Sequence, residues 1–235
     1  DDGPSVSAMT LTGSVTTDET TQLGITVTSA AALFSGGVGA AGADDGSTDV
    51  SLRIDVADSG LMTTQGSHAI ILEADANDSD IVYGRFDSDG NGSLDGTAFK
   101  LEIGEDGKLS VTQYVAIQHP DNPDNYDEPV DLTGKLSAVV TTTDGDGDVA
   151  SQSVSIGAGV VFKDDGPSVS AMTLTGSVTT DETTQLGITV TSAAALFSGG
   201  VGAAGADDGS TDVSLRIDVA DSGLMTTQGS HAIIL

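Results

Sequence analysis

The chain repeats itself, because residues 164–235 are identical, letter for letter, to residues 1–72. The repeat is therefore 163 residues long, and one whole repeat is followed by the opening part of a second. Common solenoid units have roughly 20–50 residues, so a repeat of this size is large enough to be a globular domain with its own core. We expect a complete domain over 1–163 and the opening of an identical one over 164–235.

Two other arrangements remain open, because 164–235 has no counterpart of 73–163 in this sequence. Residues 1–72 and 164–235 could be autonomous small units. They could also exchange strands, between copies or between molecules, around the single segment 73–163. The repeat pattern alone does not choose between these arrangements.

The charge balance is strongly acidic, with 36 Asp and Glu against 7 Lys and Arg, a net charge of −29. Such a surface repels nucleic-acid phosphates and anionic lipid headgroups, so we expect neither nucleic acid nor direct membrane contact. It also repels itself unless cations neutralise it. The chain has no cysteine, so disulfides cannot supply rigidity. Calcium, which is available outside cells, is the cation we expect, and the location we expect is extracellular.

The dominant hydrophobic pattern has a period of two residues and is rich in Val, Thr, Ile and Ser, which predicts an all-β protein. Asp106-Gly107 is a tight-turn signal. We expect an immunoglobulin-like β-sandwich with an aliphatic core, since aromatic residues make up only 3% of the chain. A short helical turn is expected at Ala30 to Phe34. The predicted strands are Ser5–Leu11, Leu23–Thr28, Val50–Val56, His68–Glu73, Ile81–Phe86, Ala98–Ile103, Lys108–Ala116, Leu132–Thr142 and Val149–Phe162.

One loop after a predicted strand fits the opening of a D-x-[DN]-x-[DN]-G calcium motif. Alternate oxygen ligands converge on one ion when the chain wraps around it, and Gly92 at the sixth place permits that turn. The twelfth place holds Ala98 instead of the bidentate Glu of an EF-hand, so a true EF-hand is not expected. A solvated acidic hairpin without an ion is the alternative. The predicted ligands are Asp87, Asp89, Asn91, the carbonyl of Ser93, and Asp95.

Two further acidic segments flank the last predicted strand. About 14 extended residues separate them, or roughly 45 Å, so they cannot share an ion within one domain. If the first and last strands run parallel, the 144–148 turn lies beside the domain's own entry, and the acids after the last strand meet the next copy. A stiff polar linker with Pro4 and Pro167 is the alternative reading. The predicted interdomain ligands are Asp144, Asp146, Asp148, Asp1, Asp2, Asp164 and Asp165.

Several segments in this order resemble the tandem repeats of large RTX adhesins, the calcium-dependent, type I-secreted surface proteins of Gram-negative bacteria. They are Thr17-Asp18-Glu19, residues 42–46 (GADDG), 109–120 (LSVTQYVAIQHP), 144–150 (DGDGDVA) and the DDGP at 164–167. The resemblance implies a β-sandwich extender that is rigidified by calcium, contacts neighbouring repeats of its own chain, and holds a distal ligand-binding domain away from the cell for attachment and biofilm formation. The nonapeptide RTX repeat itself is absent from this sequence.

An enzyme is not expected. His119 stands in an acidic, proline-containing loop without a nucleophile motif, so a structural loop anchor is the favoured reading, and a further calcium site in the same loop is an open alternative. His68 and its copy His231 are expected to be half-buried in strands. The remaining functional alternative is an adhesive module that binds a glycan or a surface, which needs an exposed site that is usually aromatic. The low aromatic content favours the extender.

Overall fold

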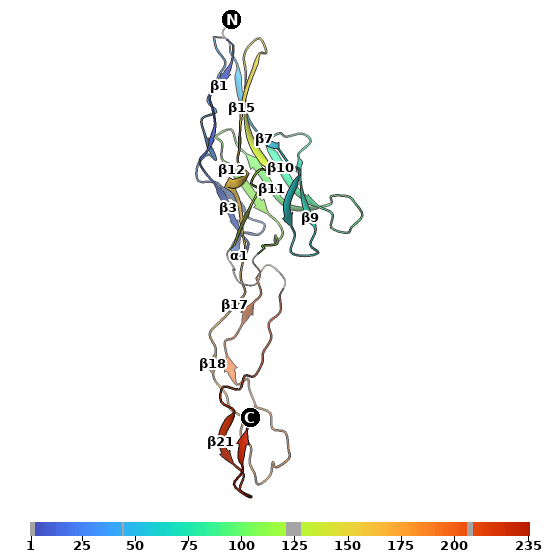
Figure 1. Cartoon of the computed structure of the whole chain (residues 1–235), viewed down its shortest axis with the longest axis vertical. Helices are drawn as coiled ribbons and strands as arrows, with labels where there is room; N and C mark the ends of the chain where they lie inside the picture. Colours follow the sequence, from blue (N-terminus) through green and yellow to red (C-terminus); the bar gives the residue numbers. More distant parts are fainter. Residues whose placement is uncertain (1–2, 44, 121–127, 206–208) are drawn as a thin grey trace.

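The computed structural model describes residues 3–43, 45–120, 128–205 and 209–235 (Figure 1). Almost all of its regular structure is β-strand, and the fold is an all-β sandwich, as the sequence predicts. The first repeat forms a packed domain near the N-terminus, and the second copy extends from the opposite end of that domain as a thin, elongated segment (Figure 1). Among the described residues, no helix has the length and apolar character needed to cross a membrane.

One layer of the sandwich is a six-stranded antiparallel sheet in the order β4-β12-β11-β10-β9-β8. The β11–β12 connection is the predicted Asp-Gly turn, with Gly107 at a φ of 71° that favours glycine. The strands are β4 (Thr26–Thr28), β8 (Asp58–Met62), β9 (Ala69–Ala74), β10 (Ile81–Phe86), β11 (Gly96–Ile103) and β12 (Leu109–Gln113).

Two three-stranded sheets form the other layer. The first has the order β15-β14-β7, with β7 (Ser47–Ile54), β14 (Leu136–Thr143) and β15 (Val149–Ser155). The second has the order β13-β16-β3, with β3 (Val15–Asp18), β13 (Pro129–Asp131) and β16 (Val160–Lys163). β16 pairs parallel to β3, so the first and last strands of the sandwich run in the same direction.

The core lies between the layers, where β7 packs against β9, β10 and β11, and β3 packs against β12. Burial alternates along β7, with Val50 and Leu52 pointing inward, as a half-buried strand requires. The core is aliphatic except for Phe99 and Phe162, whose ring centroids lie 4.9 Å apart across the layers. Strands of 3–72 thus share one core with strands of 73–163.

The first forty residues also form a narrow arm of two-stranded sheets. β1 (Ser5–Val6) pairs with β6 (Gly39–Ala40), and β2 (Thr10–Leu11) pairs with β5 (Phe34–Ser35). A single-turn helix, α1 (Glu19–Gln22), directly follows β3, and the Asp18 side chain caps it by accepting a hydrogen bond from the backbone N–H of Thr20.

Each described strand of the second copy pairs with another strand of that copy. β17 (Ser168–Val169) pairs with β20 (Gly202–Ala203), β18 (Thr173–Leu174) with β19 (Phe197–Ser198), and β21 (Asp221–Met225) with β22 (Ala232–Ile234). None of its described strands pairs with residues 73–163.

Several elements of the structure differ from the predicted ones. The helical turn at Ala30 to Phe34 is wrong, because Phe34 belongs to β5, and the described helix of this repeat lies at α1. The predicted strand Ser5–Leu11 is two short strands, β1 and β2. Leu132–Thr142 contains a turn before β14 begins at Leu136, and β8 was not predicted at all because Gly60 interrupts its apolar pattern.

The predicted strand Val149–Phe162 is broken by the 3-10 turn η1 (Gly157–Gly159), which moves the chain from the β15 sheet to the β16 sheet. A Cβ at Gly157 would lie 1.8 Å from the carbonyl oxygen of Leu132, so only glycine fits this crossing. The span between the two acidic segments is therefore not one extended strand. They nevertheless lie at opposite ends of the domain, with the β14–β15 hairpin near the N-terminus and α1 near β17 (Figure 1).

Candidate metal centre at the repeat junction

Strand register brings two acidic residues together where the first repeat ends. The parallel pairing of β3 with β16 ends with Asp18 opposite Lys163, so the next residues, Glu19 and Asp164, leave the sheet side by side. On the other side of β16, the backbone N–H of Asp164 donates to the carbonyl oxygen of Glu128 at 3.2 Å. The end of this small sheet is therefore a meeting point of acidic residues from segments far apart in the sequence.

Glu19 is the most unusual residue of this group, because its side chain is fully buried. One oxygen, Oε1, accepts hydrogen bonds from the backbone N–H of Ile117 at 2.8 Å and from Nε2 of Gln113 at 2.6 Å. Gln113 is held in turn by the hydroxyl of Thr17, which donates to its Oε1 at 2.7 Å. The other Glu19 oxygen, Oε2, is buried and has no hydrogen-bond partner among the described residues.

Burial raises the pKa of Glu19 above its ordinary value, although His119, Ile117 and Gln113 pull in the opposite direction. An ionised carboxylate with one unbonded buried oxygen is costly, and a cation or a proton at that oxygen relieves the cost. Nε2 of His119 lies 3.8 Å from Oε1, which is the Glu19 oxygen that already accepts two hydrogen bonds. Burial lowers the pKa of His119, but the nearby charges of Glu19, Asp164 and Glu128 raise it above its usual value overall.

Oxygen atoms of Glu19, Asp164 and Asp165 lie within 4.8 Å of one another. Calcium binds oxygens at about 2.3–2.6 Å, so two ligands of one ion are separated by up to about 5 Å. The spacing, the all-oxygen donors and the buried unpaired Oε2 of Glu19 fit a hard divalent cation. Asp164 and Asp165 are among the predicted interdomain ligands, whereas Glu19 is not predicted as a ligand and enters only through the resemblance.

This cluster faces the second copy. A pocket beside it is lined by Glu19 and Thr20 from the first repeat and by Ser168 and the 203–205 loop from the second. The Asp165 carboxylate lies against the loop backbone, since a Cβ at Gly205 would be 2.6 Å from its Oδ1. An ion held by Asp165 and Glu19 would join the two copies at this seam.

The second predicted group, at the β14–β15 turn, is also brought together. Oxygen atoms of Asp144, Asp146 and Asp148 lie within 4.8 Å of one another. Oδ1 of Asp144 accepts from the backbone N–H groups of Asp148 at 2.8 Å and Gly147 at 3.1 Å, which closes the turn. Its Oδ2 is buried without a hydrogen-bond partner in the described part of the chain, and the residue is only 5% exposed.

The first two carboxyls of this turn perturb each other's pKa in opposite directions. Burial opposes ionisation of Asp144, but hydrogen bonds from Asp146 and the turn backbone outweigh it and lower the pKa of Asp144. The pKa of Asp146 is raised, first by its hydrogen bond to Asp144 and then by the charge of Asp144. A divalent cation between the two carboxylates would neutralise both groups.

The internal repeat predicts that the two clusters meet at one seam of a longer array. In the first copy, the 144–148 turn packs on Gly46, where a Cβ would lie 2.9 Å from Cα of Asp144, and Ala43 and Asp45 face Gly145 and Asp146. In the second copy, Gly205, which is the copy of Gly42 in the same loop, lies against Asp165. In an array, the turn of the following repeat therefore approaches the Glu19 cluster of the preceding one. Asp1 and Asp2, the other predicted partners of the turn, lie outside the described residues.

The predicted calcium loop at 87–95 is placed differently. It is exposed, and it is not among the groups of three or more acidic or histidine side chains that come within 4.8 Å in the described structure. Asp87 accepts from the backbone N–H groups of Gly92, Gly90 and Asn91, and these bonds, that of Gly92 above all, lower its pKa. The remaining predicted ligands stay in local turns, with Asp95 bonded to the N–H of Ser88, Asp89 to that of Asn91, and Asn91 to that of Ser93.

These features define a tandem all-β sandwich repeat with carboxylate clusters at both ends. A family model described as a domain of unknown function, DUF5801, matches residues 14–157, which is more than half of the chain, and the chain belongs to this family. The match covers Glu19 and the 144–148 turn, whereas Asp164 and Asp165 lie beyond it. Neither the curated proteins nor the solved structures include a match to the chain.

Proposed function

We propose that this chain is part of a structural extender: a run of identical sandwich domains that calcium locks in line, and that holds a distal ligand-binding domain away from a bacterial surface. The resemblance to RTX adhesin repeats motivates the class of protein and the extracellular location. The proposed partners are neighbouring repeats of the same chain. No catalytic role is proposed.

The observation that carries the proposal is the Glu19 side chain, buried at the seam with Oε2 unbonded and two further carboxylates within ligand distance. A fold does not retain a buried carboxylate cluster of this kind without something that neutralises it. The chain carries 36 acidic and 7 basic residues, so its own cations are too few to do this. An ion that needs ligands from both sides of a seam also limits bending there.

A second consideration is the identity of the copies. A spacer gains length from each added copy, whereas catalysis gains little from identical tandem units. The exact repetition of 72 residues therefore favours a mechanical role over a chemical one.

The proposal is tested by thermal unfolding of the chain in calcium, in magnesium and in excess chelator. A ligand that binds only the folded state stabilises it by about 2.7 kcal/mol per site at a hundredfold excess over Kd. We expect the midpoint to rise with calcium, to rise less with magnesium, which demands a stricter geometry, and to fall in chelator. An identical midpoint in all three conditions would remove calcium from the account.

A further inference from the structure

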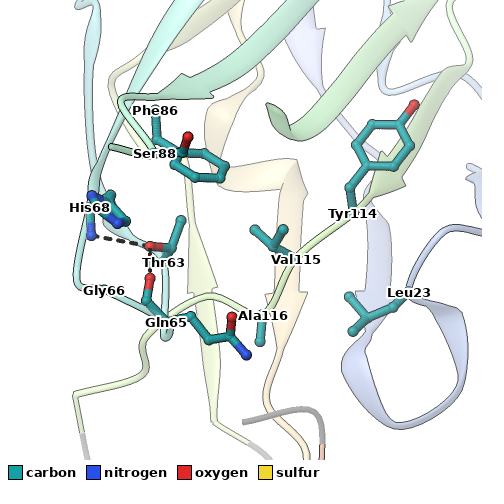
Figure 2. Close-up of a pocket in the computed structure, with 10 residues that line it drawn as sticks. All are labelled: Leu23, Thr63, Gln65, Gly66, His68, Phe86, Ser88, Tyr114, Val115 and Ala116. Carbon is teal, nitrogen blue, oxygen red and sulfur yellow. Dashed lines mark hydrogen bonds between the residues drawn. The ribbon is translucent and has the colours of Figure 1, made fainter. Parts of the chain in front are cut away.

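A pocket lies on the sandwich at the end of the six-stranded sheet (Figure 2). Its volume is about 500 Å3, within the range of small-ligand sites. Four segments build it: Leu23 after α1, the β8–β9 turn with Thr63 and His68, the end of β10 with Phe86, and the segment after β12 with Tyr114.

Aromatic rings stand on two sides of this pocket. Phe86 and His68 stack with ring centroids 5.7 Å apart, and Figure 2 shows Tyr114 on the opposite side, above Leu23. The Tyr114 residue is 45% exposed although its ring is large and apolar. In a chain with only 3% aromatic residues, this is a marked concentration of rings at one solvent-accessible place.

The walls are held in place before any ligand arrives. The Thr63 hydroxyl donates to the carbonyl oxygen of Gln65 at 2.7 Å and accepts from the backbone N–H of His68 at 3.1 Å (Figure 2). The N–H of Thr64 donates to the carbonyl oxygen of Ala116, which ties the turn to the facing segment. Gly66 has a φ of 76°, and a Cβ there would lie 2.2 Å from Nε2 of His68, so glycine lets the His68 ring pack over the turn. Preorganised walls lower the entropic cost of binding.

The chemistry of the lining selects the class of ligand. Among the described residues, no Asp, Glu, Lys or Arg lines the pocket, and the chain as a whole carries a net charge of −29, so an anionic ligand is disfavoured. Polar groups of His68 and Ser88 lie beside the rings, so a purely apolar ligand would bury them without partners. A sugar ring offers an apolar C–H face to an aromatic side chain and hydroxyls to the polar groups.

We infer that this pocket binds a single ring of a neutral saccharide, with Tyr114 and Phe86 as the apolar walls. Each complete repeat carries one such pocket, so an array of weak sites would bind a multivalent glycan with increased avidity. The inference does not rest on the extender proposal, because none of the seam residues lines the pocket.

The chain contains its own control. The second copy keeps the same turn, in which Thr226 and His231 repeat the bonds of Thr63 and His68, and Gly229 has a φ of 79°. It has no copy of Phe86 or Tyr114, because those residues belong to 73–163. Gly66 and Gly229 therefore lie in identical turns, and only the turn of Gly66 has Phe86 and Tyr114 beside it.

The test is a titration of the isotope-labelled 235-residue chain with glucose, galactose, mannose and N-acetylglucosamine, each to about 50 mM, a range that detects millimolar affinity. The readout is the amide NMR shifts of Gly66, Ser88 and Gly229, recorded in calcium and again in chelator. We expect at least one neutral sugar to shift Gly66 and Ser88 but not Gly229. Equal shifts of Gly66 and Gly229, or no shift with any sugar, would overturn the inference.

Substitution and competing ligands sharpen the result. Tyr114→Ala should weaken binding by about tenfold, as the loss of an aromatic contact does. Tyr83→Ala, on the same sheet but outside the pocket, should leave binding unchanged. Equal affinity in the Tyr114→Ala variant, or tighter binding of phenol or sialic acid than of every neutral sugar, would contradict the assigned ligand class. If sugar binding persists in chelator while thermal stability is insensitive to calcium, the extender mechanism fails and this inference stands.

Discussion

Residues 3–72 and 166–235 have the same sequence, yet only the first copy packs into a sandwich domain. Leu52 is 8% exposed in β7, whereas its copy Leu215 is 101% exposed and lies outside any strand. Val50 and its copy Val213 differ in the same way, at 5% and 66%. Identical local sequence thus gives different structure when the partner strands differ.

The elements that survive in the second copy are those with local partners. The β8–β9 hairpin recurs as β21–β22, and the small β1–β6 and β2–β5 pairs recur as β17–β20 and β18–β19. The counterparts of β3, β4 and β7 are missing among the described residues, because their partners β16, β12 and β14 lie in 73–163. Non-local pairing, rather than strand propensity, decides which segments of this repeat become strands.

The largest effect is expected when the missing partners are supplied. Appending a copy of residues 73–163 after Leu235 should fold the second repeat and bury the 210–217 segment. Amide hydrogen exchange measures this directly. Val213 and Leu215 should change from rapid exchange to the protection of Val50 and Leu52. Rapid exchange at 210–217 in the extended chain would show that the two copies differ for another reason.

A matched pair of core substitutions gives the next largest effect. Leu52→Ala should reduce the free energy of unfolding by about 2–4 kcal/mol, because it removes buried methyl groups and leaves a cavity. Leu215→Ala, in the same sequence context, should change it by less than about 0.5 kcal/mol. Urea unfolding of both variants provides the comparison. Similar losses would mean that the second copy is buried in solution.

Glu19 at the seam and its exposed copy Glu182 can be compared by the same substitution. Glu19→Gln should remove most of one calcium site, lowering the calcium-dependent gain in stability by about 2 kcal/mol, while Glu182→Gln, at the exposed copy, should leave it intact. In chelator, Glu19→Gln should instead raise the stability, because the amide retains the bonded Oε1 and no longer buries a charge. Thermal unfolding of the two variants with and without calcium measures both effects. A calcium response that Glu19→Gln leaves unchanged would exclude Glu19 as a ligand.

The smallest effect is a pH slope in chelator. Since burial raises the pKa of Glu19 above 4.5, the folded state holds its proton more tightly than the unfolded chain does. Its contribution to stability is therefore full at low pH and falls as the pH rises through 4.5 and beyond. The difference in stability between the wild type and Glu19→Gln should follow this fall, whereas Glu182→Gln should run parallel to the wild type. A flat difference would contradict the raised pKa.

The sequence predicted the all-β class, the Asp-Gly turn and most sandwich strands, because those follow from two-residue periodicity and local turn chemistry. It could not predict β16 as a separate strand, since the η1 crossing depends on the contact of Gly157 with Leu132. His68 is half-buried as expected, whereas His231 is exposed for lack of the same neighbours. Glu19 was missed because its burial depends on Ile117 and Gln113, about a hundred residues away.

The acidic segments also differ in how far adjacent residues determine their structure. The 144–148 turn is a local cluster that could be read from adjacent residues, and the structure brings its three carboxylates together. The 87–95 loop also reads as a cluster, and its Asp87 and Asn91 side chains accept hydrogen bonds from nearby backbone N–H groups. The calcium assignments at both places remain predictions.

Small-angle X-ray scattering of the extended chain with two complete repeats tests the central claim most directly, because it reports the angle between neighbouring domains. With calcium, we expect a single elongated particle with a well-defined maximum dimension. In excess chelator, we expect a shorter average dimension and a broad distribution, as the charged seam opens and bends. The same straight, narrow profile in both conditions would contradict a junction held by metal.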